Sequence, residues 1–381
     1  GFFAAALVGI PLGLLIGRIT SIREFVDPTL QLLRPVPVTA WLPLSMIFFG
    51  IGPNAAIFLV FLGAFYPIVF NTTFGVRSVD ARLFEAAAML GCKGPSLFRQ
   101  VVLPASLPAI LNGLRLGHGF AWILIVVGEM TGVQQGLGAT ITTDYFNGAP
   151  NIVPDSAMTT TSSSTKSSLT VLSVSHLDKN FSVGGRTTQA LHDVNLSINK
   201  GEFVCLIGAS GCGKSTLLRI LAGFETASSG VVNMYGMPIT GPGPERGMVF
   251  QDFALFPWLS VRENIAFGPH QRSLPKAKLD KISGYYMDMV GLTKFADFYP
   301  GQLSGGMKQR VAIARVLAND CEVLLMDEPL GALDKKLRER TQFELVNILE
   351  SVGVTCVMVT HDQEEAMTMA TRIAVMSQGR V

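Results

Sequence analysis

Gly208-Ala-Ser-Gly-Cys-Gly-Lys-Ser-Thr216 fits the phosphate-binding pattern G-x-x-x-x-G-K-[ST]. An apolar segment, 203–207, precedes this stretch, and a segment of helical character, 217–221, follows it. Glycines let backbone N–H groups turn inward around phosphate oxygens, and the N-terminus of the following helix adds its positive end. The stretch therefore predicts a strand, a loop and a helix that together hold a nucleoside triphosphate.

Two side chains of this loop have expected roles. Lys214 should reach the β- and γ-phosphates, and the hydroxyl of Ser215 should ligate Mg²⁺. A glycine-rich turn without a ligand is the alternative, but the fixed positions and both flanks favour a phosphate site. The other nucleotide-binding candidates of the loop are Gly208, Ser210, Gly211, Gly213 and Thr216.

Composition limits the class of protein. The chain has 381 residues, enough for two domains, and its net charge of +2 gives no case for a nucleic-acid partner. Apolar residues make up 49% and charged residues 15%, and the apolar excess is concentrated in the first part of the chain. The five cysteines are scattered without a C-x-x-C pair. They indicate neither a zinc site nor a disulfide framework and favour a reducing compartment.

The apolar excess lies in four runs, at 1–17, 36–52, 54–74 and 110–127. A membrane helix needs about 20 apolar residues, and four such runs favour membrane spans over buried helices of a soluble core. If the second and third runs form a hairpin, both adjoining loops lie on one side, and the positive-inside rule puts them in the cytoplasm. Their basic residues are Arg18, Arg23, Arg34, Arg77, Arg82, Lys93 and Arg99.

Polar residues interrupt the fourth run at Asn112, Arg115 and His118, and Glu129 lies near its end. An ionisable group inside a membrane segment is a functional candidate by default. His118 and Glu129 could equally lie at the membrane interface, so neither is assigned as a solute ligand.

The loop between the third and fourth runs has a pattern of its own: Glu85-Ala-Ala-Ala-Met-Leu-Gly91, followed by Gln100-Val-Val-Leu-Pro104. Composition predicts a short helix, a break at the glycine, a second helix and a proline. The pattern resembles the EAA loop of ABC-importer permeases, in which this loop forms a coupling helix seated in a groove of the ATPase. The matching residues are Glu85, Ala86, Ala87, Gly91, Leu103 and Pro104. The surrounding stretch, 9–139, resembles the nitrate, sulfonate, taurine and bicarbonate branch.

Further along, an apolar strand at 321–326 delivers Asp327 and Glu328 at its carboxyl end, where parallel sheets place ligands. Asp327 should hold Mg²⁺ through water, and Glu328 should polarise the water that attacks the γ-phosphorus. A solvated acidic pair in a loop is the weaker alternative. Another buried strand, 354–360, ends at His361.

These motifs follow the order of ABC ATPases, and the resemblance assigns the remaining roles. Phe181 lies where that family has an aromatic that stacks on adenine, although an ordinary strand aromatic fits its spacing as well. Gln251 matches the Q-loop, which contacts Mg²⁺ or the attacking water and touches the coupling helix. Asp334 matches the D-loop at the dimer seam, and His361 matches the switch histidine that contacts the γ-phosphate.

A second phosphate-type motif is Leu303-Ser-Gly-Gly306, which resembles the ABC signature. Ser304, Gly305 and Gly306 precede a helical segment at 309–317, so they too form an anion-binding N-terminus. In the resembling family two ATPase domains pair head to tail. The resemblance thus implies that each Ser304 loop closes on the γ-phosphate held by the other domain's Lys214.

The expected domains are a partial transmembrane permease domain (1–154, coupling loop 77–104), a Ser/Thr-rich linker (155–168) and a C-terminally truncated ABC ATP-binding domain (169–381). Met158 reads as the start of a separate frame, which suggests that two genes are joined here. The fourth run crosses outward and no later apolar run returns the chain. Either one run does not cross or the permease half is incomplete, and we favour incompleteness.

The predicted fold class is a partial α-helical transmembrane bundle joined to an α/β P-loop ABC ATPase domain. The expected function is ATP-driven uptake of a small oxyanion (nitrate, sulfonate or taurine, or bicarbonate) across the bacterial inner membrane, with the ATPase on the cytoplasmic side. ATP and Mg²⁺ are the implied cofactors. The implied partners are a second ATPase domain, permease subunits and an extracytoplasmic substrate-binding protein.

Three alternatives stay open. The stretches 331–338 and 352–367 are closer to the ATPases of polyamine importers. A soluble ABC ATPase of translation or DNA repair is a second alternative, which the coupling loop and the apolar runs disfavour. A fused fragment with intact motifs but no transport path is the third.

Overall fold

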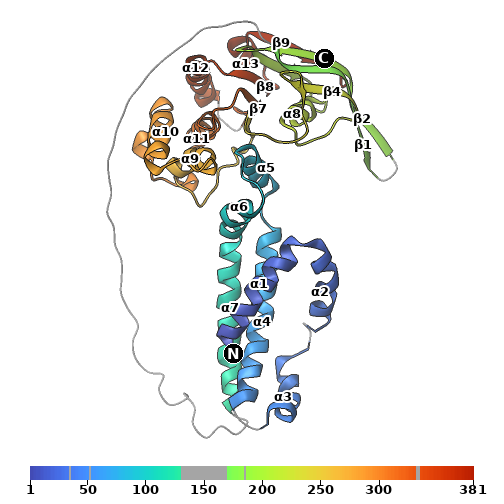
Figure 1. Ribbon diagram of the computed structural model, residues 1–381, viewed down its shortest axis with the longest axis vertical. Helices are drawn as coiled ribbons and strands as arrows, with labels where there is room; N and C mark the ends of the chain where they lie inside the picture. The colour runs from blue at the N-terminus through green and yellow to red at the C-terminus, as the bar shows by residue number, and fades with distance from the viewer. Residues whose placement is uncertain (34–35, 51–52, 130–169, 184–185, 332–334) are drawn as a thin grey trace. The chain divides into compact units, whose positions relative to one another are not determined.

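The computed structural model describes residues 1–33, 36–50, 53–129, 170–183, 186–331 and 335–381, which Figure 1 draws as ribbon. They fall into two compact units. One is helical and comprises 1–80 with 98–129, and the other is an α/β unit comprising 81–97 with 170–381. This confirms the predicted fold class. The predicted linker, 155–168, lies outside the described residues.

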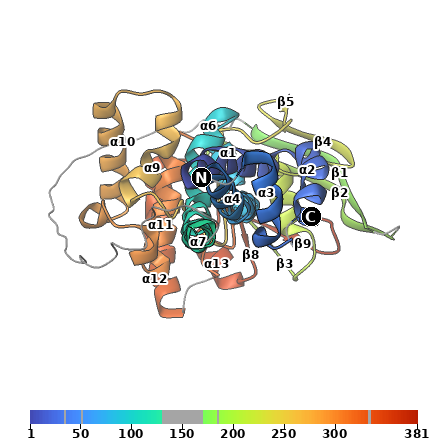
Figure 2. The ribbon, with the colours of Figure 1, turned by 90° about the horizontal axis from the view of Figure 1, so that it is seen from below.

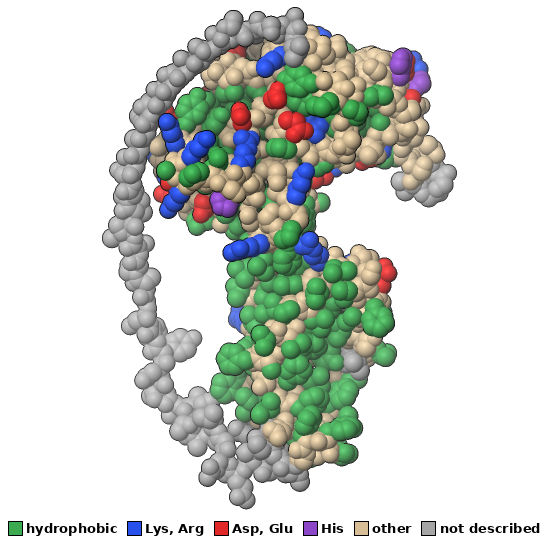
Figure 3. All heavy atoms as spheres, viewed as in Figure 1, with side chains coloured by type: hydrophobic (Ala, Val, Ile, Leu, Met, Phe, Trp, Pro, Cys, Tyr) green, Lys and Arg blue, Asp and Glu red, His purple; other side chains and the backbone are tan. Residues whose placement is uncertain are grey.

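The helical unit contains two helices long and apolar enough to cross a membrane, α4 and α7. Helices α1 and α2 would add a third span if they are counted as one span bent by 117°. Hydrophobic side chains dominate the visible surface of this unit (Figure 3). Its elements are α1 (Phe2–Arg18), α2 (Thr20–Leu33), η1 (Val38–Trp41), α3 (Leu42–Phe49), α4 (Pro53–Arg77), the π-helix η2 (Phe98–Val102) and α7 (Leu103–Glu129).

The prediction of a membrane span over the second apolar run, 36–52, is wrong. Among the described residues this run forms only η1 and the eight-residue helix α3. Eight residues of α-helix extend about 12 Å, well short of the roughly 30 Å of a hydrocarbon core. Proline lacks an N–H and disfavours a helical residue before it, so Pro37 and Pro43 divide the run.

Helix α1 packs on α4 through a stripe of glycines. A Cβ atom added at Gly13 would lie 2.7 Å from the Cβ atom of Thr72, and one added at Gly17 would lie 2.7 Å from that of Val76. Small residues at every fourth position let helix backbones approach this closely. The pairings advance together along both helices, so α1 and α4 run parallel. Arg18 and Arg77 therefore end at the same side, as expected for the basic loops.

Helix α7 packs antiparallel on the other flank of α4 (Figure 2). Gly113 of α7 lies against Asn71 and Pro67, whereas Gly117, one turn later, lies against Ala64. The buried residues Ile110, Ala121 and Leu124 share the face of α7 that carries these glycines. That face is used for packing, so the opposite side of α7 is left exposed.

The α/β unit contains two sheets. A five-stranded parallel sheet has the order β6-β7-β8-β3-β9, and a four-stranded antiparallel sheet has the order β2-β1-β4-β5. The strands are β1 (Thr170–Val183), β2 (Arg186–Asn199), β3 (Phe203–Gly208), β4 (Ser229–Met234), β5 (Met237–Pro238), β6 (Arg246–Val249), β7 (Val323–Asp327), β8 (Thr355–Thr360) and β9 (Arg372–Met376).

Helices cover the parallel sheet, as a sheet buried on both faces requires. Those in contact with its strands are α5 (Ala81–Met89), α8 (Lys214–Ala222), α11 (Gly305–Leu317) and α13 (Gln363–Met369). The other helices of the unit are α6 (Pro95–Leu97), α9 (Val261–Gln271), α10 (Lys276–Met289), η4 (Thr293–Phe295), η5 (Pro300–Gln302) and α12 (Lys335–Val352). Strands β3, β7 and β8 lie where the apolar runs predict them, and their carboxyl ends form one edge. The functional side chains gather at that edge.

We expect Gly13→Leu to destabilise the helical unit, because its side chain would overlap Thr72 on α4. Overpacking of this kind costs about 1–3 kcal/mol. Thermal unfolding of the detergent-solubilised chain measures the effect. The matched control is Gly119→Leu on α7, where an added Cβ meets no atom within 4 Å. Equal unfolding temperatures for the two variants would contradict the close packing of α1 on α4.

Candidate functional site

The phosphate-binding loop joins β3 to α8, and its glycines are there for steric reasons. A Cβ atom at Gly208 would lie 2.2 Å from the carbonyl oxygen of Met376. Gly211 and Gly213 have φ angles of 79° and 106°, a region that residues with side chains rarely adopt. The chain can turn through this loop only with glycine at these positions. The loop therefore presents backbone, not side chains, to a ligand.

Lys214 and Ser215 begin α8, as predicted. Lys214 is 6% exposed, and its Nζ donates to the carbonyl oxygens of Gly208 (2.7 Å) and Ala209 (2.9 Å). The ammonium group is thus held inside the curve of the loop. The Ser215 hydroxyl donates to Oδ1 of Asp327 at 3.1 Å. This bond joins the start of α8 to the end of β7.

Asp327 and Glu328 follow one another at the carboxyl end of β7. Burial raises the pKa of Asp327, and the hydrogen bond from Ser215 opposes that shift only in part. The positive charges and hydrogen-bond donors around its carboxylate therefore do not fully offset the cost of burying it. Glu328 has a φ angle of 44°, which is uncommon for a residue with a side chain. Its backbone N–H donates to the carbonyl of Val359 on β8, which holds this turn in place.

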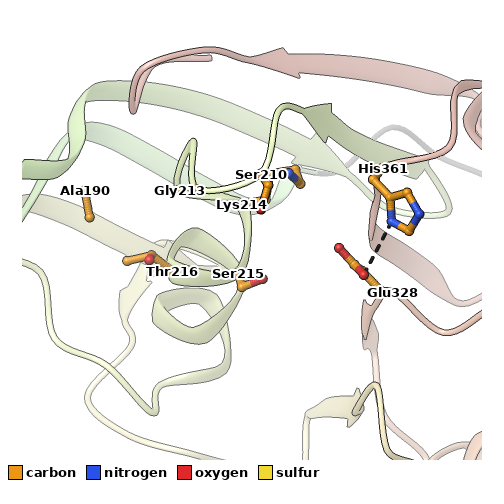
Figure 4. Close-up of a pocket in the computed structure, with 9 residues that line it drawn as sticks. Ala190, Ser210, Gly213, Lys214, Ser215, Thr216, Glu328 and His361 are labelled. Carbon is orange, nitrogen blue, oxygen red and sulfur yellow. Dashed lines mark ion pairs between the residues drawn. The ribbon is translucent and has the colours of Figure 1, made fainter. Parts of the chain in front are cut away.

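The structure brings the three predicted catalytic residues together. Oε2 of Glu328 accepts a hydrogen bond from Nε2 of Gln251 at 3.4 Å and lies 3.4 Å from Nδ1 of His361. Figure 4 shows the His361–Glu328 pair across a cavity from Lys214 and Ser215. The three residues come from the ends of three neighbouring strands of the parallel sheet, β6, β7 and β8.

A cavity of about 360 Å³ lies between the loop and this cluster. Its walls combine a lysine ammonium, backbone amides and hydroxyls on one side with a carboxylate and an imidazole on the other, which fits the phosphates of a nucleotide. Oxygen ligands from Ser215 and the under-neutralised Asp327 fit Mg²⁺. The cavity is lined by Ala190, Ser210, Gly211, Gly213, Lys214, Ser215, Thr216, Glu328 and His361. Of these, Ala190 on β2 was not predicted, since alanine carries no chemical signal.

Other predicted nucleotide-binding residues do not line this cavity. Phe181 lies on β1, where Nζ of Lys179 sits 4.8 Å from its ring centroid, and its adenine role stays a prediction. Ser304 caps α11 by accepting from the N–H of Met307, and Gly305 and Gly306 open that helix. Asp334 lies outside the described residues.

Residues 81–97 belong to the same compact unit as the cassette (170–381). Helix α5 carries Glu85, Ala86 and Ala87 and ends in a turn around Gly91, whose φ angle is 83°. This confirms the predicted helix and glycine break. Ala86 and Met89 are buried in the same hydrophobic cluster as Leu217 and Phe250 of the cassette. Leu103 and Pro104 instead begin α7, in the helical unit.

An ion pair joins α5 to α8. The guanidinium of Arg219 donates to both carboxylate oxygens of Glu85, at 2.6 and 3.2 Å. This bidentate geometry is the strongest form of such a pair. The hydrogen bond with Glu85 raises the pKa of Arg219. The sequence pattern predicts a role for Glu85 but none for Arg219, because an arginine within an amphipathic helix has no distinguishing pattern.

Two further contacts fix α5 on the cassette. Arg82 pairs with Asp252, the residue directly after Gln251. At the other end of α5, Nδ2 of Asn319 donates to the carbonyl of Met89 at 3.4 Å. The Q-loop and the C-terminal end of α11 thus both contact the segment that resembles a coupling helix.

Arg315 of α11 holds the Q-loop from inside. It is 1% exposed, and its guanidinium donates to the carbonyls of Ala254 (2.7 Å) and Phe253 (3.1 Å). Both of these residues have positive φ angles, 43° and 62°. A buried guanidinium that satisfies two strained carbonyls fixes the conformation of the loop. The helix that starts at the Ser304 motif is therefore tied to the Q-loop and, through it, to α5.

Comparisons with known proteins agree with this arrangement. The family model "ABC transporter" matches residues 191–331, and the family model "Binding-protein-dependent transport system inner membrane component" matches residues 9–176. A dimeric ATP-binding cassette solved in a post-hydrolysis state with ADP and Pi is 34% identical, with a TM-score of 0.50. That match covers 55% of this chain and 96% of the solved chain.

Three relatives carry names of transport or import ATP-binding proteins. The putrescine transport ATP-binding protein PotG of Escherichia coli is 56% identical over 50% of this chain and 52% of its own length. The nitrate import protein NrtD of Synechocystis sp. is 49% identical over 54% of this chain and 77% of its own. The taurine import protein TauB of Roseobacter denitrificans is 49% identical over 55% and 78%. The chain thus spans about half the length of the first of these relatives.

We expect Lys214→Ala to weaken ATP binding about tenfold or more, because a charged hydrogen-bond donor to phosphate is lost. Glu328→Gln should retain ATP binding and lower turnover by a factor of about 10²–10⁴, the usual contribution of a general base. Fluorescent-nucleotide titration and phosphate release measure the two quantities. Undiminished hydrolysis by the Glu328→Gln variant would show that the Glu328 carboxylate is not the general base.

The raised pKa of Asp327 gives a pH dependence with a defined sign. Above this pKa the ligand-free fold holds a disfavoured buried carboxylate, which a bound cation stabilises. The gain in unfolding temperature from Mg²⁺ with a non-hydrolysable ATP analogue should therefore shrink as the pH falls toward the raised pKa of Asp327. Asp327→Asn should remove most of that pH dependence. An unchanged slope in this variant would show that another group titrates.

Proposed function

Because the chain belongs to the ABC transporter family, we propose that it couples ATP hydrolysis in its cassette to movements of a permease that imports a small oxyanion. The carrying observation is the bidentate pair between Glu85 and Arg219. It joins a permease-type segment to the helix whose first residue is Lys214. The chain itself connects 81–97 at both ends to the helical unit, so movement of the cassette would be transmitted to α4 and α7.

The residues of the cavity have distinct roles in the proposed hydrolysis. Lys214 and the loop amides bind the β- and γ-phosphates, and Ser215 and Asp327 would hold Mg²⁺. The metal, when bound, supplies neutralising charge to the phosphates. Glu328 orients the attacking water and accepts its proton, and His361 and Gln251 position the Glu328 carboxylate and the γ-phosphate.

A second cassette is the proposed partner at this site. Ser304 and its glycines do not line the cavity of their own chain and form a capped helix N-terminus, which suits an anion. A similar solved cassette is dimeric. In the proposed dimer each Ser304 motif closes the other cavity, and α11 transmits that closure to the Q-loop through Arg315.

The proposed solute is an oxyanion such as nitrate, taurine or bicarbonate. Relatives named for these solutes and the permease-type resemblance of 9–139 support it. In this proposal residues 1–154 are a permease domain, 155–168 a linker and 169–381 the cassette. The cassette lies on the cytoplasmic side of a bacterial inner membrane, and an external binding protein delivers the solute. The alternative is a polyamine importer, which the relative named for putrescine favours.

Charge reversal tests the coupling pair. Glu85→Arg or Arg219→Glu should each lower ATP-dependent uptake about tenfold or more, because a charged bidentate bond becomes a repulsion. The double reversal should recover part of the uptake. The experiment reconstitutes the full chain in proteoliposomes and measures uptake of labelled nitrate, taurine and putrescine together with ATP hydrolysis.

The matched control is Arg262→Glu, which reverses an arginine in the exposed pair with Asp297, 3.9 Å apart. Exposed pairs contribute little, so uptake and hydrolysis should stay within about twofold of the unmodified chain. If the single reversals leave uptake intact, the pair has no part in coupling. Uptake of putrescine alone would replace the oxyanion with the polyamine alternative.

A further inference from the structure

One side of α7 is polar although the helix is long and apolar enough to span a membrane. Successive helical residues turn by about 100°, which places Asn112, Arg115, His118 and Trp122 within an arc of about 120°. All four are exposed. The same arc also contains the exposed Leu111 (56%), and beyond it Leu116, Phe120 and Ile123 form an exposed apolar side, 45%, 49% and 61% accessible. We call the arc of Asn112, Arg115, His118 and Trp122 the polar face.

The packing of α7 on α4 fixes the depth of Arg115. This residue lies between Gly113, which contacts Asn71 and Pro67, and Gly117, which contacts Ala64 and Ile68. It is therefore about level with Ile68, nine residues before Arg77 at the end of α4. Nine residues of α-helix correspond to about 13 Å. In a hydrocarbon core of roughly 30 Å, that distance places the guanidinium near the middle.

A guanidinium at this depth is unfavourable unless it faces water or an opposite charge. The spans Asn54–Arg77 and Pro95–Ile125 contain no aspartate or glutamate. Within the part of the chain that the structure describes, no ion pair involves Arg115. Among the described residues, Arg115 is therefore a positive charge at membrane depth without an acidic partner, on a face that α4 does not cover.

The groups around Arg115 are suited to an anion. Nδ2 of Asn112 donates to Oδ1 of Asn71 at 3.1 Å, and Nδ2 of Asn71 donates to the carbonyl of Pro67 at 2.8 Å. The side-chain amide nitrogen of Asn112 carries two hydrogens, so one of them stays available for a further hydrogen bond. The planar guanidinium matches an oxyanion in a bidentate manner. A polyamine carries positive charges, which Arg115 would repel.

We propose that the polar face of α7 lines the solute path and that Arg115 binds the oxyanion, with Asn112 as a neighbouring donor; this inference rests on the proposed function. The path is water-filled at this depth, and the anion supplies the charge that the described spans lack. The apolar side with Leu116 and Phe120 faces lipid or packed helices. Arg115 thereby selects anions over cationic solutes.

Cysteine labelling in proteoliposomes of the full chain tests both parts of the proposal. The reagent is the anionic, water-soluble 2-sulfonatoethyl methanethiosulfonate. Asn112→Cys should react at least tenfold faster than Leu116→Cys, which lies on the apolar side one turn, about 6 Å, further along α7. Background reaction is measured with the unmodified chain, in which Cys205, Cys321 and Cys356 have pKa values raised by burial.

Ligand binding is read from protection of the same thiol. Sodium nitrate, against sodium chloride at equal ionic strength, should slow the labelling of Asn112→Cys at least threefold, and so should zwitterionic taurine, through its sulfonate group, against buffer alone. Putrescine should not slow it. Adding Arg115→Gln should abolish the protection, Arg115→Lys should keep part of it, and Arg77→Gln, at the exposed end of α4, should leave it unchanged.

The outcomes separate this inference from the function on which it rests. Equal labelling of Asn112→Cys and Leu116→Cys, or protection that survives Arg115→Gln, would overturn the role of Arg115. ATP-dependent uptake of nitrate or taurine in the unmodified chain would still support the proposed function in either case. Protection by putrescine and not by the anions would overturn the oxyanion proposal and this inference together, but would leave the Glu85–Arg219 coupling intact.

Discussion

The nine-residue helix α8 carries the two charges on which the proposed cycle depends. Lys214 begins it and reaches into the phosphate loop, and Arg219, about 7.5 Å further along the axis, holds Glu85 of α5. A helix of two and a half turns transmits displacement as a rigid body. Whatever moves the loop around the phosphates therefore also moves the anchor of the coupling segment, without a separate relay.

A second connection runs through buried charge. Arg315 sits within the cassette core and binds two Q-loop carbonyls, and the Q-loop residue Asp252 pairs with Arg82. A buried guanidinium is costly unless all its partners stay in place, so α11 and the Q-loop must move together. The segment 81–97 thus contacts α8 through Glu85 and the Q-loop through Arg82. Both α8 and the Q-loop also reach the nucleotide cavity.

The sequence predicted the cavity well because its chemistry needs fixed spacings. Gly208, Lys214, Asp327, Glu328 and His361 follow strands whose apolar character is visible, and parallel strands bring their carboxyl ends to one edge. Arg219 and Arg315 could not be found in this way, since their roles depend on which element packs against them. The run 36–52 differs from the predicted span because Pro37 and Pro43 divide it into short helical segments, which its hydrophobicity alone does not reveal.

The cassette does not identify the solute, because the residues that would recognise a solute lie outside the cassette. Its functional surfaces contact a nucleotide, a coupling segment and, in the proposal, a second cassette, and none of these contacts involves the solute. Cassettes of polyamine and oxyanion importers can therefore be nearly equally similar to this chain. In the proposal, discrimination within the membrane comes from the spans Asn54–Arg77 and Pro95–Ile125, which contain no aspartate or glutamate. In that proposal a cation finds no acidic side chain within these two spans, whereas an anion pairs with Arg115.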